Sequence, residues 1–149
     1  MKTGFLITFV PMAALLAIAG VSAGPAQDPP PAFARVCSKC HDGTRIVEGR
    51  RLRSQWEETL EKMTALGATG TDEDFEAILD YLVRVHGRVN VNTAPATEIE
   101  LVLHLEPEHA TAIVKFREKH GKFADFDALT KVPGVPIEAL NKARDAIVF

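Results

Sequence analysis

Cys37-Ser38-Lys39-Cys40-His41 is the stretch on which the fold of the first half of this chain depends. Two thiols three residues apart, followed directly by an imidazole, form the C-x-x-C-H arrangement that attaches a c-type haem. Each thiol can form a thioether to the porphyrin, and the imidazole can become the proximal ligand of the iron. We therefore expect Cys37, Cys40 and His41 to bind one covalently attached haem c, with His41 on the metal. The macrocycle would supply apolar core that so short a segment lacks.

Two other uses of a C-x-x-C pair are a thioredoxin-like redox site and half of a zinc site. A thioredoxin motif follows a strand in a βαβ unit, and a structural zinc site needs about four ligands. The chain has no cysteine besides these two, and residues 32–36 read as a short helix rather than a strand. The sequence therefore favours haem attachment over both alternatives.

The first residues have the features of an export signal. Met1–Gly4 carries one lysine, Phe5–Gly20 is apolar, and Val21-Ser22-Ala23 resembles a signal-peptidase site. We expect residues 1–23 to be a signal peptide, which places the mature protein in the periplasm. Because the apolar run is about the minimum length of a membrane span, a retained N-terminal anchor is the alternative. Residues 24–31 are a proline-rich spacer.

Residues 32–87 show three helical patterns. Ser54 is the expected N-cap of the second helix, and Thr71 begins the third, with three acidic residues favourable to its dipole. The second pattern places on one face Trp56, Leu60, Met63 and Gly67. The third is a stripe of apolar residues ended by Gly87, namely Phe75, Ile78, Leu79, Leu82 and Val85.

Residues 88–149 predict two helix-turn-helix units in tandem. Asn90–Pro95 opens a helix, Glu106-Pro107-Glu108 breaks it, and a second helix stops near Gly121. A short helix at 126–129 leads through Val132–Val135 into a last helix, which carries Ile137, Leu140, Ala143 and Ile147. No strand pattern is visible, so the expected fold class is all-α. The net charge of −3, with acids and bases interspersed, gives no electrostatic argument for nucleic acid or anionic lipid.

The sixth position on the iron would decide what a haem does. Met63 is the only methionine beyond the leader and lies two helical turns after Trp56, so we expect Met63 to be the second iron ligand. His86 is the runner-up, and Trp56 is expected against the porphyrin. Ordinary core packing is the alternative for Met63 and for Trp56. A peroxidase-like or ligand-sensing haem needs a vacant sixth position on the iron. Met63, as the expected ligand there, argues against such a role. No catalytic residues stand out, and a non-enzymatic role is expected.

The stretch from Cys37 to Gly87 resembles a small class I cytochrome c. The resemblance rests on the C-x-x-C-H motif, Trp56, Met63, Gly67-Ala68 and Asp80-Tyr81-Leu82. It implies single-electron transfer to a redox protein partner, with His/Met ligation of the iron. The loop that carries the methionine in longer cytochromes is absent.

Residues 88–149 resemble the tandem helix-hairpin-helix module of ComEA-type competence receptors. The resemblance rests on Val89–Ala94, Ala112–Phe123 and Leu129–Val135. It implies binding of duplex DNA without reading of sequence, through backbone amides and cations near the turns. The residues that would contact phosphates are Lys131, Gly134, Val135 and Lys142. The sequence departs from the family by carboxylates at Glu106 and Glu108, and by Pro136 in place of a second glycine.

Two functions follow from these resemblances. The leading one is an exported c-type cytochrome that carries single electrons, with residues 88–149 as a docking module. The alternative is a haem-bearing periplasmic protein that binds DNA without sequence preference. Membrane association would follow only if the leader is retained.

Overall fold

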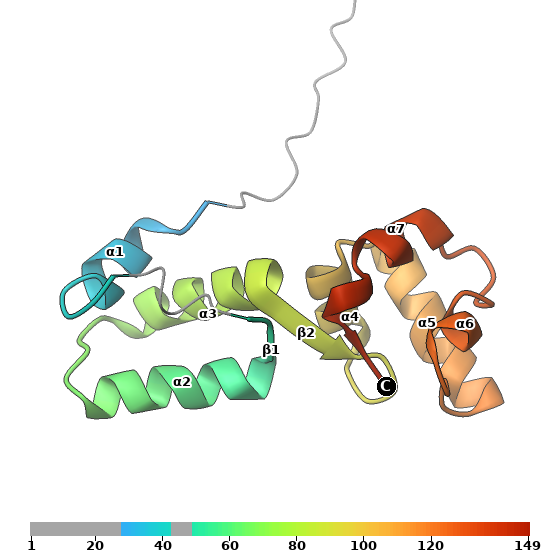
Figure 1. Ribbon diagram of the computed structural model, residues 1–149, viewed down its shortest axis with the longest axis horizontal. Helices are drawn as coiled ribbons and strands as arrows, with labels where there is room; N and C mark the ends of the chain where they lie inside the picture. Colours follow the sequence, from blue (N-terminus) through green and yellow to red (C-terminus); the bar gives the residue numbers. More distant parts are fainter. Residues whose placement is uncertain (1–27, 43–48) are drawn as a thin grey trace, which may run out of the picture.

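The computed structural model describes residues 28–42 and 49–149 (Figure 1). The predicted leader and residues 24–27 of the spacer lie outside these ranges. In chain order the elements are α1 (Pro31–Cys37), β1 (Arg51–Leu52), α2 (Arg53–Ala65), α3 (Asp72–His86), β2 (Gly87–Asn90), α4 (Ala96–Leu103), α5 (Pro107–His120), α6 (Phe126–Leu129), α7 (Ile137–Lys142), the 3₁₀ turn η2 (Arg144–Ala146) and β3 (Ile147–Val148).

The molecule has two helical ends joined by β2 (Figure 1). In the first half, α2 and α3 form a hairpin, and α1 packs on α3. In the second half, α4 and α5 form one helical hairpin, and α6 and α7 form another. Helix α4 also contacts α3 and β2, so the halves touch through helices as well as through the strand.

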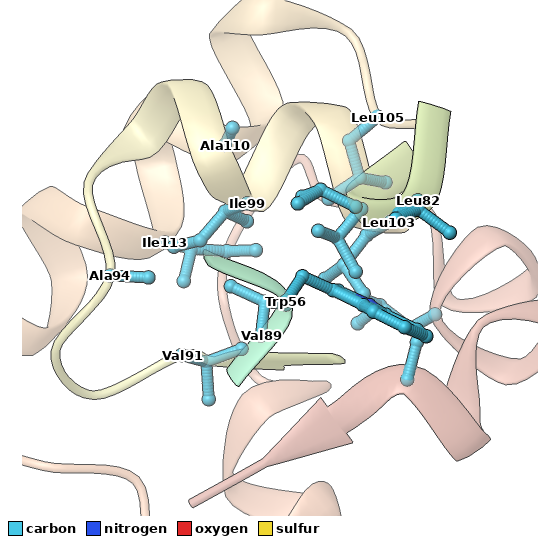
Figure 2. Close-up of a cluster of buried hydrophobic side chains, with 14 of the residues drawn as sticks. Trp56, Leu82, Val89, Val91, Ala94, Ile99, Leu103, Leu105, Ala110 and Ile113 are labelled. Carbon is cyan, nitrogen blue, oxygen red and sulfur yellow. The ribbon is translucent and has the colours of Figure 1, made fainter. Parts of the chain in front are cut away.

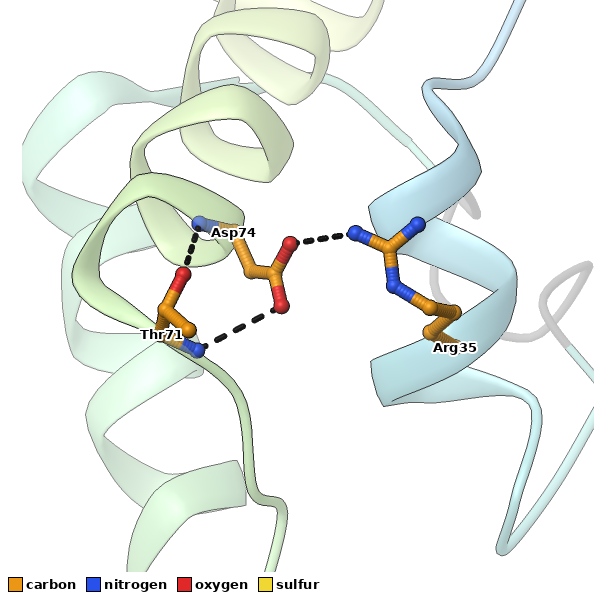
Figure 3. A network of polar contacts seen from close by, with 3 residues as sticks. All are labelled: Arg35, Thr71 and Asp74. Carbon is orange, nitrogen blue, oxygen red and sulfur yellow. Dashed lines mark hydrogen bonds and ion pairs between the residues drawn. The ribbon is translucent and has the colours of Figure 1, made fainter.

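The start of α3 confirms the predicted cap at Thr71. The hydroxyl of Thr71 accepts a hydrogen bond from the amide of Asp74 at 3.2 Å, and the Asp74 carboxylate accepts one from the amide of Thr71 at 3.3 Å. The Arg35 guanidinium donates to the same carboxylate (Figure 3). Its hydrogen bond, together with that of the Thr71 amide, holds the pKa of Asp74 below its ordinary value. This network joins α1 to the beginning of α3.

Two predicted helix ends are corrected. Helix α2 begins at Arg53, so Ser54 lies inside it, and the Gln55 side chain accepts from the amide of Leu52 at 3.0 Å instead. A long side chain three residues into the helix can cap as a short hydroxyl does. The last helix ends at Lys142 rather than running to Ile147, which lies in a strand.

The expected all-α class is correct in its helices and wrong in omitting a small sheet. Three strands pair in the order β1-β2-β3, all parallel, with Arg51 opposite Gly87 and Val89 opposite Ile147. The strands have two to four residues. Alternation of apolar and polar residues is legible only over about four to eight residues, so such strands leave no signal in the sequence.

One apolar core runs through both halves. Trp56 and Leu82 of the first half are fully buried, as are Val89 and Ile99 of the second (Figure 2). Full burial of one such side chain stabilises a protein by about 1.5–3 kcal/mol. The boundary expected between residues 87 and 88 falls inside β2, and the apolar core extends across it.

Candidate functional site

The two helical hairpins of the second half repeat one pattern at an offset of 30 residues. Four pairs of equivalent positions are buried to a similar degree. Ile99 and Leu129 are both 0% exposed, and Leu105 and Val135 are 6% and 7% exposed. The other equivalent pairs in the core are Val102 with Val132 and Ala110 with Leu140. The second half is therefore a structural duplication around a shared core.

Each hairpin turn contains a residue in the left-handed conformation at the equivalent position. His104 ends α4 with φ 51° and ψ 42°, and Gly134 has φ 82°. Within the described ranges, His104 is the only residue besides glycine with positive φ. A side chain there costs about 1–2 kcal/mol, whereas glycine adopts the conformation freely. The turn geometry is thus retained at His104 although glycine is absent.

Both turns lead into the N-terminus of a helix, where the first amides lack partners within the helix. Such a terminus favours an anion because of these amides and the helix dipole. The charges around the two turns differ. Exposed Glu106 and Glu108 border the first turn, whereas Lys131 lies in the second, with Glu138 following. The second turn is the better match to a phosphate.

The four residues predicted to contact phosphate separate into two places. Lys131 and Gly134 are exposed in the second turn itself. Val135 is 7% exposed and packs into the core, so only its backbone belongs to the turn surface. Lys142 lies in the last turn of α7 and lines a cavity with His104 and Arg50.

The predicted haem ligands lie together. Cys37, His41, Leu60 and Met63 line two adjoining cavities, of about 110 and 230 Å³, and Cys40 lines the smaller one. The other walls are mostly apolar, with Val36, Leu66, Ala68 and Phe75 on the smaller cavity and Leu82 on the larger. Burial raises the pKa of the Cys37 thiol. Two thiols, an imidazole and a thioether facing one apolar space are the donor set that fits a covalent haem.

Trp56 and His86 do not line these cavities. The indole of Trp56 is fully buried, donates from Nε1 to the carbonyl of His86 at 3.2 Å, and lies under the Arg51 guanidinium. The ring of His86 packs edge-on against Tyr81, with centroids 5.8 Å apart, and burial, then the charge of Arg50, lower its pKa. The structure therefore places Trp56 in the core and separates His86 from His41.

Two residues of interest escaped the sequence analysis, namely Arg50 and His104. They come together in a cavity of about 400 Å³ between the halves of the chain. His104 occupies a turn position where glycine is expected, and this departure was the sequence signal that could have identified it. Nothing in the sequence near Arg50 indicates that its side chain reaches a helix more than 50 positions away.

Within residues 28–42 and 49–149, no group of three or more His, Cys, Asp or Glu side chains is arranged to hold a metal ion.

The family comparison concerns the second half of the chain. Residues 85–148 match the helix-hairpin-helix motif family. An uncharacterized protein of Haemophilus influenzae is 42% identical over 66 residues, which are 44% of this chain and 59% of the relative. ComE operon protein 1 of Bacillus subtilis is 34% identical over 59 residues, 40% of this chain and 29% of that protein. The match thus spans less than two thirds of either relative. No solved structure matches significantly.

These matches overturn the leading interpretation of the chain as an electron-carrying cytochrome. The family match falls on the hairpin units, which that interpretation treated only as a docking module, and none of the matched proteins is named as a cytochrome. That interpretation rested on the five residues Cys37–His41. The second half of the chain, with its two equivalent hairpins, carries the family match instead. A redox protein partner has no support either. Over residues 85–148 this chain is similar to the helix-hairpin-helix motif family.

Proposed function

We propose that this protein binds duplex DNA without reading its base sequence, through the turns that precede α5 and α7. The observation that carries the proposal is the duplication itself: two equivalent turns, each with a left-handed residue, each opening a helix. The similarity to ComE operon protein 1 supports it. We further propose that, as in competence receptors, the DNA is substrate for uptake at the cell surface.

Backbone amides and lysines explain why such binding would ignore sequence. Phosphates are identical at every base pair, so contacts to them position a protein without specifying bases. The second turn supplies Lys131 and the exposed Gly134, where the backbone can approach closely. The first turn opposes a phosphate with Glu106 and Glu108. We therefore assign most of the affinity to the second turn.

The overall charge of the module predicts weak binding. Residues 88–149 carry eight Lys and Arg side chains against nine Asp and Glu side chains. Long-range attraction to DNA is consequently absent, and affinity depends on a few local contacts. Each neutralised phosphate contributes about −0.9 to the slope of log K against log salt. If about two phosphates are neutralised, the expected slope is near −2.

The experiment is fluorescence anisotropy of the full chain with two fluorescent duplexes of equal length and unrelated sequence, at low salt. Equal affinity for both is expected, and Lys131→Glu should weaken both equally. Lys119→Glu is the matched control, because Lys119 is exposed at the far end of α5 from its turn. Absence of binding to either duplex at low salt would overturn the proposal.

We also propose that the first half carries covalent haem c. The supporting observation is that Cys37, Cys40, His41 and Met63 line one mostly apolar space. The thiols would hold the porphyrin, with His41 and Met63 toward the iron, and the bound group would supply a redox-active metal centre. The walls from Leu60, Phe75 and Ala68 would exclude water.

Mass spectrometry of denatured full-length protein, made in a host with haem-maturation proteins, tests this. Wild type should retain the mass of one haem after denaturation. Cys37→Ala/Cys40→Ala should retain none, whereas Met63→Ala should retain the mass but show altered iron ligation in its optical spectrum. A wild-type protein without added mass would contradict the proposal.

Export to the periplasm is proposed from residues 1–23. Within the described residues no helix is both long and apolar enough to span a membrane. Sequencing the N-terminus of the mature protein should find Gly24 first. A protein that begins at Met1 and sediments with membranes would indicate the retained anchor instead.

A further inference from the structure

A cavity of about 400 Å³ lies between the two halves of the molecule. Its walls come from three places: the last turn of α4, one side of α7, and Arg50 in the segment before β1. The apolar part of the wall includes Val102, Leu103 and Ala143. Three nitrogen-bearing side chains, Arg50, His104 and Lys142, face this space together with one carboxylate, Glu138.

The arginine is held in place by the first half. Its Nη1 donates to the carbonyl oxygens of Val85 and Gly87, at 3.3 and 3.2 Å. These bonds fix the guanidinium at the end of α3, opposite α7. A cation already positioned loses less conformational entropy on binding a ligand than a free surface lysine does.

The positive charge of this region is not neutralised within the described residues. The ion pairs there join Arg35, Arg53 and Lys62 to carboxylates, and none includes Arg50, Arg84 or Lys142. The Nε atom of Arg84, on α3, is shielded from solvent and has no hydrogen-bond partner. Partial desolvation, followed by the charges of Arg50 and Arg84, lowers the pKa of His104. On the cavity wall itself, the cations Arg50 and Lys142 outnumber the single carboxylate, Glu138.

We propose that this cavity binds a phosphate group, held by Arg50 and Lys142, with His104 as a further donor. Phosphate oxygens accept charge-assisted hydrogen bonds from guanidinium and ammonium groups, which are stronger than neutral ones. The phosphate is that of the DNA backbone or that of a small phosphorylated compound. If it belongs to DNA, the inference rests on the proposed function and extends the DNA surface to Arg50, outside residues 85–148.

The experiment follows the imidazole of His104 by NMR in the full chain, with pyrophosphate as the probe and chloride added to equal ionic strength as the blank. Bound pyrophosphate should raise the pKa of His104, because a nearby anion favours the protonated ring. His104→Gly assigns the resonance, and it should fold, since glycine suits φ 51°.

Two matched substitutions test the contacts. Lys142→Gln should weaken pyrophosphate binding about tenfold or more, the effect of losing a hydrogen bond to a charged group. Lys119→Gln, at an exposed lysine near the end of α5 that does not line the cavity, should leave the affinity unchanged. Glu138→Gln should strengthen binding, because it removes the one carboxylate of the wall.

A duplex DNA competitor separates the two sources of phosphate. If DNA displaces pyrophosphate, the cavity is a subsite for the DNA backbone; if it does not, the ligand is a small phosphorylated compound, and both results uphold the site. The site stands even if the chain fails to bind DNA, provided that pyrophosphate raises the pKa of His104. An unchanged pKa of His104, or equal affinities for Lys142→Gln and Lys119→Gln, would overturn the inference.

Discussion

The two hairpin turns of the second half have the same backbone and different chemistry. Gly134 and Lys131 in the second turn are suited to a phosphate, whereas His104, Glu106 and Glu108 occupy the first. Four equivalent positions in the core of the two units nevertheless match in exposure. The comparison shows that the core maintains the fold of each hairpin, while the exposed turn residues are free to change the binding chemistry.

Substitutions at equivalent core positions should have the largest effect. Ile99→Ala and Leu129→Ala each remove a fully buried side chain, and each should lower the free energy of unfolding by about 2–5 kcal/mol. Urea denaturation of both variants measures this. A cost below about 1 kcal/mol for one of them would show that the two units do not share the core equally.

Removing the carboxylates of the first turn should make it resemble the second. Glu106→Gln/Glu108→Gln should tighten DNA binding severalfold at low salt, because like charges beside a phosphate oppose it by about 1 kcal/mol in water at close range. Glu118→Gln, which changes an exposed residue further along α5, is the control. If anisotropy gives the same affinity for both variants, the first turn does not face the DNA.

Substitutions at the left-handed position should change the stability of the protein in opposite directions in the two turns. His104→Gly should stabilise the protein by about 1 kcal/mol, and Gly134→Ala should destabilise it by a similar amount. Thermal unfolding followed by circular dichroism measures both. Destabilisation by His104→Gly would mean that the imidazole makes a stabilising contact in the cavity.

The smallest expected effect is the contribution of His104 to the pH dependence of stability. The pKa of His104 is lowered in the folded state, so the unfolded state binds its proton first as the pH falls. Wild type should therefore lose stability relative to His104→Gly as the pH falls through about 6.5, the ordinary pKa of histidine. Below the folded-state pKa the difference should stop growing. Urea denaturation at pH 7.5 and pH 5.5 tests this, and a difference that is equal at both would contradict it.

The helices were predictable because their signals are local. Thr71 and its acids begin α3, and the apolar stripe through Leu82 gives its buried face. The strands were not predictable, because Ile147 and Val148 adopt a strand only by pairing with β2 across the molecule. The start of α2 was missed since Gln55, rather than Ser54, caps it.

The candidate sites divide in the same way. The C-x-x-C-H motif and Met63 were read from spacing, and they do share a cavity. Trp56 lies in the core rather than on these cavities, which is the alternative that the sequence left open for it. The cluster of Arg50, His104 and Lys142 comes from three distant segments, so only the tertiary structure could show it.

The salt dependence of DNA binding tests the central claim most directly. Anisotropy titrations of wild type, Lys131→Glu and Lys119→Glu with one duplex, at several salt concentrations, give three slopes of log K against log salt. If the second turn is the main contact with the DNA phosphates, Lys131→Glu should make the slope shallower by about 0.9. Lys119→Glu should leave the slope unchanged. Equal slopes for all three proteins would contradict it.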